Sequence, residues 1–270
     1  MTEFVNRPLR LKPRSGLAVQ YAAIRALFLR ELQTRFGHYR LGYLWAILEP
    51  GLIIAFKLIL FNTIRERMAP GIEFSVFLIV GVCLFYMVMR SMTKNLGVVA
   101  SNRGLFIYRS VKPIDAIIAR TFLEFCLYFF CFIVFSLLLI WSGYHLNFSH
   151  IPFFFLIWVV MFFLALGLAM IMAVIGDLSP EISKFISGSM IVFYLMSGLL
   201  FSINSIPEKF LPYILWNPVV HGLEYARWAV SPTYSTQYVS FWYLCVCTLI
   251  VFFSGLLLYK VREKDMLKSK

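Results

Sequence analysis

Residues 152–175 read PFFFLIWVVMFFLALGLAMIMAVI, a run of 24 residues without a charged side chain. A helix needs roughly 20 apolar residues to cross the hydrocarbon core of a bilayer, so this run is long enough to do so. The whole chain of 270 residues agrees, because 61% of it is hydrophobic and only 14% is charged. A soluble domain carries about 25% charged residues. The composition therefore excludes a water-soluble globule and indicates an integral membrane protein.

Further apolar stretches of similar length lie on both sides of this run. Together with 152–175 they predict transmembrane helices at residues 44–64, 74–93, 121–142, 182–203 and 240–259. No internal repeat divides the chain. We therefore expect an all-α polytopic membrane protein with six transmembrane helices, folded as a single domain over residues 1–270.

The basic residues are distributed unequally between the loops on the two sides of these spans. Of the 25 Lys and Arg residues, 20 lie in the N-terminal segment, the loop after the second span, the loop after the fourth span and the C-terminal tail. The loops on the other side contain four, and Lys57 lies within the first span. Because loops rich in Lys and Arg remain in the cytoplasm, the sequence predicts that both termini are cytoplasmic.

Residues 17–36 precede the first span and have the pattern of an amphipathic helix. One apolar stripe at helical spacing consists of Leu17, Tyr21, Ile24, Phe28, Leu32 and Phe36. Arg30 lies opposite this stripe, while Arg25 and Arg35 flank it. The pattern predicts a helix in the cytoplasmic membrane interface. A soluble helix packed against the bundle is the alternative.

Residues 205–230, between the fifth and sixth spans, are aromatic and apolar but interrupted by prolines. We expect two short helices at about 206–215 and 218–230, with Asn217 as N-cap and Pro218 at the first helical position. Trp216, Tyr225 and Trp228 suit the outer membrane interface. The alternative is an ordinary structured external loop.

The cytoplasmic loop at residues 95–115 mixes aromatic and basic residues. Such a segment, held between two spans, is suited to dock into a groove of a cytoplasmic partner, with Phe106 and Tyr108 as apolar anchors. Arg109 and Lys112 would pair with acidic groups of that partner. A basic loop that contacts lipid headgroups remains the alternative.

Charged residues within the predicted spans include Glu49, Lys57 and Glu124. Lys57 is deep in the first span, where a cation is costly unless it faces water or a partner, so it could line a polar path for an anionic substrate. A structural ion pair with Glu49, two turns earlier, is the competing interpretation. Glu49 could also pair with Arg40 or with a neighbouring helix. Glu124 is expected to pair with Arg120, four residues earlier.

Motifs for catalysis and for cofactors are absent from the sequence. There is no phosphate loop of the G-x-x-x-x-G-K-[ST] type, and the four histidines form no metal-ligand motif. Paired carboxylates and a nucleophile elbow are also lacking. The clustering of basic residues in loops does not suit a nucleic-acid-binding face. We therefore expect no catalytic residues, no metal site and no cofactor on this chain.

Five motifs stand out along the chain: RALFLRE at 25–31, TRFG at 34–37, YRLGYLWAILEP at 39–50, VKPID at 111–115 and LWNP at 215–218. Together they resemble those of the capsular polysaccharide export permeases, the ABC-2 type membrane subunits of Gram-negative ABC transporters. The similarity runs over nearly the whole chain, and the first block is the most specific.

This resemblance implies a homodimer in the bacterial inner membrane, bound to two copies of a separate ATPase that holds ATP and Mg²⁺. The dimer would export a lipid-linked acidic polysaccharide to a periplasmic co-polymerase and an outer-membrane export protein. It also implies that the N-terminal helix and the loop after span two contact the ATPase, and that residues 205–230 cover the periplasmic exit. Candidate coupling residues are then Arg30, Arg35, Phe106, Tyr108, Arg109, Lys112 and Asp115, candidate path residues are Trp45, Glu49, Lys57 and Tyr86, and candidate gate residues are Trp216, Tyr225 and Trp228.

Two alternatives to this function stay open. Within the same family, the substrate could be O-antigen or another cell-surface polysaccharide. Outside it, the chain could be a transporter without an ATPase or a membrane-embedded transferase. A secondary transporter would favour internal repeats, and a transferase would favour clustered acid–base residues. The sequence shows neither feature.

Overall fold

The computed structural model describes the chain in six segments. These are residues 15–37, 42–60, 71–107, 111–144, 146–147 and 150–267. Within these ranges the regular elements are α-helices and short 3-10 turns, and no strand is present. The expected all-α class is therefore confirmed for the part of the chain that is described.

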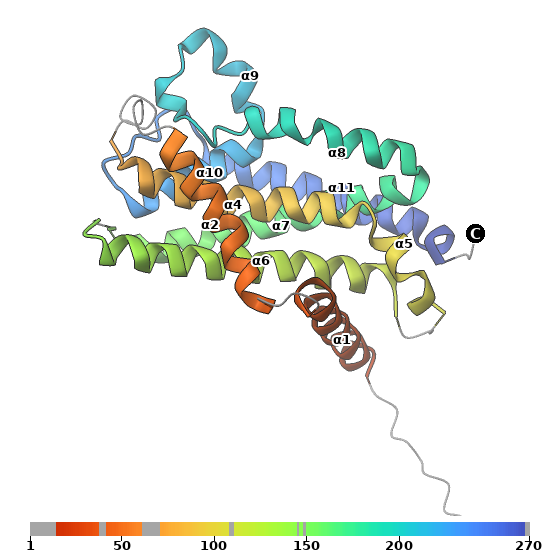
Figure 1. Cartoon of the computed structure of the whole chain (residues 1–270). Helices are drawn as coiled ribbons and strands as arrows, with labels where there is room; N and C mark the ends of the chain where they lie inside the picture. Colours follow the sequence, from red (N-terminus) through yellow and green to blue (C-terminus); the bar gives the residue numbers. More distant parts are fainter. Residues whose placement is uncertain are drawn as a thin grey trace, which may run out of the picture.

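Four helices are long and apolar enough to cross a membrane, and they lie side by side in the bundle (Figure 1). They are α4 (Phe74–Asn95), α6 (Pro113–Trp141), α7 (Ile151–Leu178) and α11 (Phe241–Leu267). They correspond to the predicted second, third, fourth and sixth spans. The structure lengthens three of them, because α6 begins before residue 121, α7 continues past residue 175, and α11 continues past residue 259.

The other two predicted spans form shorter helices, α2 (Trp45–Leu60) and α8 (Pro180–Leu195), of 16 residues each. Sixteen residues extend about 24 Å, less than the roughly 30 Å hydrocarbon core. The prediction of a helix over 182–203 was too long, since the chain turns after Leu195 and Gly198 adopts a positive φ of 65°. The end of the predicted span 44–64 lies outside the described residues. The count of six spans thus stays a prediction.

Helix α4 forms the centre of the bundle. In its most apolar window, 83% of the residues are buried, against 17% for α11 at the periphery. It contacts α2, α6, α7 and α10 (Pro218–Val230), so it is surrounded on nearly all sides. A polar side chain on α4 therefore faces another group of the chain unless it lies on the part of the helix that these neighbours do not cover.

Close backbone contact joins α7 to α11. A Cβ atom at Gly255 would lie 2.5 Å from the carbonyl oxygen of Gly167, and one at Gly167 would lie 2.7 Å from the Cα of Phe252. Any larger residue at either position would push the two helices apart. Small residues at a helix crossing are the usual means of tight packing between membrane helices.

Helix α1 (Gly16–Phe36) packs across the beginning of α6, and Ser15 caps it by accepting a hydrogen bond from the Ala18 amide. Its predicted apolar stripe is only partly used. Ile24, Phe28 and Phe36 lie against or within the bundle, whereas Leu17 and Tyr21 are 81% and 70% exposed. The stripe therefore contacts the bundle only from Ile24, in the third turn of the helix, onwards.

The segment between α8 and α11 forms a cap at the end of the bundle opposite α5 (Val98–Asn102) and the C-terminus (Figure 1). The expected helix at 206–215 is instead divided into a 3-10 turn at Glu208–Phe210 and the single turn α9 (Pro212–Leu215). The expected helix at 218–230 is confirmed as α10. As predicted, the Asn217 side chain caps it by accepting a hydrogen bond from the Val219 amide.

Candidate functional site

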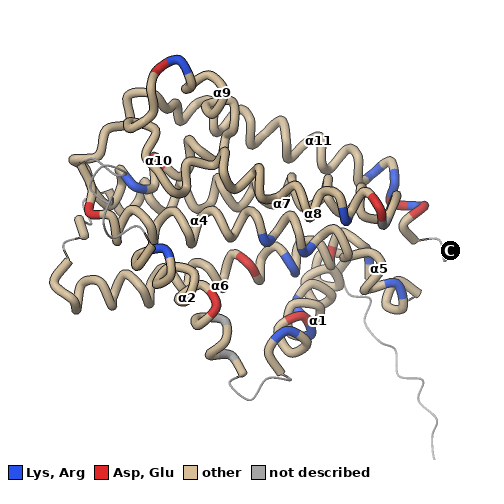
Figure 2. The backbone as a smooth tube through the Cα atoms, turned by 45° about the horizontal axis from the view of Figure 1, so that its top comes forward, with Lys and Arg blue, Asp and Glu red and all other residues tan. Residues whose placement is uncertain are grey.

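Charged residues gather at the end of the molecule that carries α1, α5 and the C-terminal part of α11 (Figure 2). Fewer lie along the middle of the bundle and at the opposite end. In the described part of the chain, no group of three or more His, Cys, Asp or Glu side chains could hold a metal ion. The polar chemistry of the molecule therefore falls into three regions, one at each end and one in the middle.

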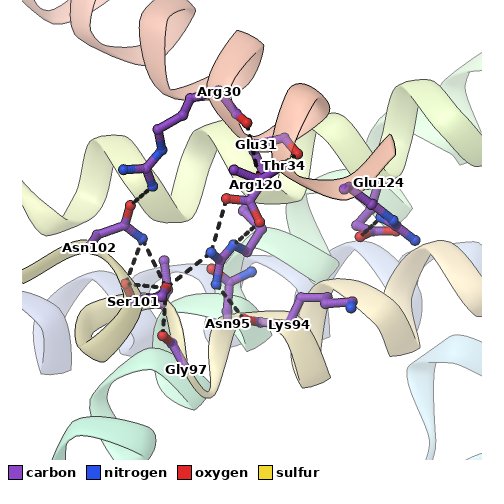
Figure 3. A network of polar contacts seen from close by, with 12 residues as sticks. Arg30, Glu31, Thr34, Lys94, Asn95, Gly97, Ser101, Asn102, Arg120 and Glu124 are labelled. Atoms are coloured by element: carbon purple, nitrogen blue, oxygen red, sulfur yellow. Dashed lines mark hydrogen bonds and ion pairs between the residues drawn. The ribbon is translucent and has the colours of Figure 1, made fainter. Parts of the chain in front are cut away.

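At the charged end, Arg120 of α6 joins three elements (Figure 3). Its Nη2 donates to Glu31 of α1 at 3.0 Å and to the Ser101 hydroxyl of α5 at 3.2 Å, while its Nη1 donates to the Lys94 carbonyl at the end of α4 at 2.8 Å. The guanidinium group has several donors in a fixed plane, which suits it to this role. Arg120 therefore fixes α1 against α4, α5 and α6.

Two arginines of α1 also contact the bundle, although the sequence pattern places Arg30 opposite the apolar stripe. Arg30 donates a hydrogen bond to the Asn102 side chain, and Arg35 pairs with the buried Glu124 at 2.5 Å. The predicted pairing of Glu124 with Arg120 is wrong, because α1 lies across α6 and supplies a separate partner to each charge. Both candidate coupling arginines thus hold α1 in place.

The loop at 95–115 is anchored by its own side chains. Phe106, expected to be an anchor for a partner, is buried in a core cluster with Val98 and Ile117, while the next residue, Ile107, is 84% exposed. Tyr108 and Arg109 lie outside the described residues. Among the described residues of the loop, Ile107 is thus an exposed apolar side chain that could contact a partner, and the sequence reasoning did not single it out.

The start of α6 shows what the other two coupling candidates do. Asp115 is buried and accepts hydrogen bonds from the Lys112 amide at 2.9 Å and from Gln20 of α1 at 3.2 Å. It therefore closes a capping box at the first turn of α6. The ammonium of Lys112 is more exposed and lies 3.5 Å from Glu263 of α11.

The C-terminal end of α11 supports the same loop from the other side. Besides the contact of Glu263 with Lys112, the buried Asp177 of α7 lies between Arg103 of the loop, at 3.7 Å, and Arg262 of α11, at 3.9 Å. The sequence reasoning did not single out Asp177, although it is the only charged residue between His150 and Ser179. The loop is therefore held between α1 and α11.

In the middle of the bundle, Glu49 of α2 forms an ion pair with Arg90 of α4. The expectation that Glu49 pairs with a neighbouring helix is confirmed, and its pairing with Lys57 is wrong, because Arg90 occupies the carboxylate. Among the described residues no group accepts a hydrogen bond from the Lys57 ammonium, although that side chain is only 7% exposed. The ammonium lies 4.7 Å from the ring centroid of Tyr194 and 5.5 Å from that of Tyr86.

The candidate gate residues have different surroundings from one another. Trp216 is 62% exposed, and its carbonyl accepts a hydrogen bond from the Tyr243 hydroxyl at 2.7 Å. Tyr225 and Trp228 instead pack against the ring of Phe153, with centroid distances of 5.9 and 5.7 Å. These two rings therefore fasten α10 to α7, and only Trp216 is available at the surface of the cap.

The cap contains a buried ion pair that the sequence reasoning missed. Arg227 is fully buried, lies 2.8 Å from Glu224 and donates to the carbonyls of Gly198 and Leu199 at 2.9 and 3.2 Å. Its guanidinium carbon lies 3.5 Å from the ring centroid of Phe77 in α4. The Tyr234 hydroxyl donates to the other Glu224 oxygen at 2.7 Å. This network ties α10 to α4 and to the turn after α8.

Comparison with known proteins assigns a family to this arrangement. Residues 22–231 match the model of the family described as ABC-2 type transporter. The chain is 41% identical to the polysialic acid transport protein KpsM of Escherichia coli over 256 residues, which cover 95% of this chain and 99% of that protein. It is 28% identical to the capsule polysaccharide export inner-membrane protein CtrC of Neisseria meningitidis serogroup B, over 89% of this chain and 91% of CtrC. It is 27% identical to the capsule polysaccharide export inner-membrane protein BexB of Haemophilus influenzae, over 94% and 96%.

Proposed function

Because the chain belongs to the ABC-2 type transporter family, we propose that it is the membrane permease of an ATP-driven exporter of capsular polysaccharide. The observation that carries this proposal is the 41% identity to KpsM, which extends over almost the full length of both proteins. The names of CtrC and BexB, capsule polysaccharide export inner-membrane proteins, support the same class of substrate and the same membrane.

The proposed transporter has two copies of this chain and two copies of an ATPase. The ATPase holds ATP and Mg²⁺, and this chain supplies the route through the inner membrane. The substrate is a lipid-linked acidic polysaccharide, which passes to a periplasmic co-polymerase and an outer-membrane export protein. Export of O-antigen by the same mechanism is the alternative.

The proposed topology has six spans with both termini in the cytoplasm. The four helices of membrane-crossing length, together with α2 and α8, support six crossings, and the distribution of Lys and Arg supports the orientation. Cysteines introduced into the loop at 65–73 and at the C-terminus test it with a membrane-impermeant reagent. The two positions should label from opposite sides. Labelling from the same side would contradict this topology.

The proposed contact with the ATPase is formed by α1 and the loop at 95–115. These elements are held on α6 and α7 by the contacts of Arg120, Asp115 and Asp177. A movement of the ATPase against the exposed Ile107 would therefore shift the helix bundle and not only deform the loop. The proposed exit lies beneath the cap at 205–230, which the Arg227 network fastens to α4.

Removal of the chain from its capsulated host tests the function. Cells without it should lose surface capsule and accumulate the polymer in the cytoplasm, and the chain should co-purify with an ATPase. Loss of O-antigen with intact capsule would favour the alternative substrate. Unchanged surface capsule and unchanged O-antigen would contradict both.

A further inference from the structure

One stripe of the central helix α4 is not fully buried. From Phe74 to Phe85 the residues of α4 are buried without interruption, but Tyr86, Arg90 and Lys94 are half-buried or exposed. Their spacing of four residues places them on one face of the helix. This stripe starts near the middle of α4 and runs to its cytoplasmic end.

Lys57 of α2 lies at the inner end of this stripe. Its ammonium lies over the ring of Tyr86 and over that of Tyr194 of α8. Three helices thus meet around one cation. Arg90, one turn along the stripe from Tyr86, pairs with Glu49 of the same helix as Lys57.

The stripe is positively charged. Lys57, Arg90 and Lys94 contribute three cations, and Glu49 is the acidic residue that the structure pairs with one of them. The neighbouring Arg35 and Glu124 compensate each other. An anion that enters from the cytoplasmic end would therefore meet Lys94 first and Lys57 last.

The Lys57 ammonium is costly to bury in this state. An unpaired cation is strongly disfavoured away from water. The two cation–π contacts offset part of this cost, and the described part of the chain offers this ammonium no hydrogen-bond acceptor. The remaining cost would be offset by a ligand that brings a negative charge.

We propose that Lys57, Tyr86 and Tyr194 form a subsite for the carboxylate of an acidic sugar unit during export. This inference rests on the proposed function. The ammonium holds the carboxylate, the tyrosine rings give the sugar an apolar surface, and Lys94 with Arg90 draws the anionic polymer along α4 towards them. One cation binds each unit weakly, which suits a polymer that must keep moving.

Matched substrates test this subsite in the transporter reconstituted with its ATPase in inverted vesicles. The first is a lipid-linked sialic acid oligomer, and the second is the same molecule with its carboxylates reduced to alcohols, which keeps any charge of the lipid linker. Wild type should take up the acidic oligomer faster in the presence of ATP. Lys57→Met should slow that uptake by roughly fivefold and leave uptake of the reduced oligomer unchanged, a loss of about 1 kcal/mol.

Two further variants make the result specific. Lys57→Arg retains the cation and should keep most of the preference, which also covers the case in which Lys57→Met inserts poorly. Lys209→Met removes a lysine that lies 4.9 Å from the ring centroid of Phe210 on the exposed cap, and it should change nothing.

The outcomes separate the subsite from the function. If Lys57→Met keeps the full preference for the acidic oligomer, the subsite is wrong while the permease function stands. If it slows both oligomers equally, Lys57 binds a group common to both, such as the linker, and the sugar subsite is again wrong. If wild type takes up neither oligomer, the proposed function fails.

Discussion

Arg227 and Lys57 are both buried cations that lie over aromatic rings, yet they differ in everything else that surrounds them. Arg227 has a carboxylate and two carbonyl oxygens within hydrogen-bond distance. The Lys57 ammonium has only the two tyrosine rings, as far as the structure describes its surroundings. The difference indicates that Arg227 stabilises the fold, whereas the charge of Lys57 is available to bind the proposed anionic polymer.

The residue types suit these roles. A guanidinium is planar and has five donors, so it can satisfy several fixed acceptors at once. An ammonium is a compact charge on a flexible stem and exchanges partners easily. Arg227 meets three segments of the chain, while Lys57 extends from α2 towards a face of α4 that is left open.

The largest loss of stability is expected at Arg227, the buried cation with the most complete set of partners. Arg227→Met leaves Glu224 buried without its partner, and breaking a buried pair on one side costs about 3–5 kcal/mol. We expect a marked loss of folded protein in the membrane and a lower midpoint of thermal unfolding in detergent. The double variant Arg227→Met with Glu224→Gln removes the stranded charge and should recover part of the loss. An Arg227→Met protein as stable as wild type would show that this pair does not hold the cap.

A smaller loss of stability is expected at the charged end of the bundle, where the ion pairs are less deeply buried. Glu124→Gln removes the charge that holds Arg35, and a hydrogen bond to a charged group contributes about 1.5–3 kcal/mol. Amide hydrogen exchange in α1 should rise while exchange in α7 stays unchanged. Glu181→Gln, an exposed acidic residue of α8, is the control and should alter neither. Unchanged protection of α1 would mean that its apolar contacts alone fix it.

These pairs mark the limit of what the sequence could predict. Apolar runs and proline signals predicted the four long helices and the Asn217 cap, because they depend on neighbouring residues. The partner of Glu124 could not be predicted in this way, since it is set by how α1 crosses α6. Glu224 lies three residues before Arg227 in α10, so helical spacing could have indicated that pair, but the carbonyl partners of Arg227 depend on how the turn after α8 folds over α10. Phe106 directly follows the 3-10 turn at Arg103–Leu105 and is buried, whereas Ile107 is exposed, a difference that the apolar character of both residues did not indicate.

The loop at 95–115 offers a comparison of two adjacent residues. Ile107→Ala should weaken association with the ATPase by about 1–2 kcal/mol without lowering the amount of folded permease, because the side chain is exposed and would be covered only by the partner. Phe106→Ala should instead loosen the loop and lower the amount of folded protein. Co-purification with the ATPase, normalised to the permease, separates them. If Ile107→Ala binds normally, Ile107 is not an anchor.

Of the two buried cations, Lys57 is expected to contribute less to stability. A comparison of the two tests most directly the claim that Arg227 stabilises the fold while Lys57 serves transport. The measurement is the midpoint of thermal unfolding of Lys57→Met and Arg227→Met, purified side by side in the same detergent. Lys57→Met should remain within about 3 °C of wild type, equivalent to roughly 1 kcal/mol for a protein of this size, while Arg227→Met should fall well below it. If the midpoint of Lys57→Met falls as far as that of Arg227→Met, the account is contradicted, because Lys57 would then stabilise the fold as Arg227 does.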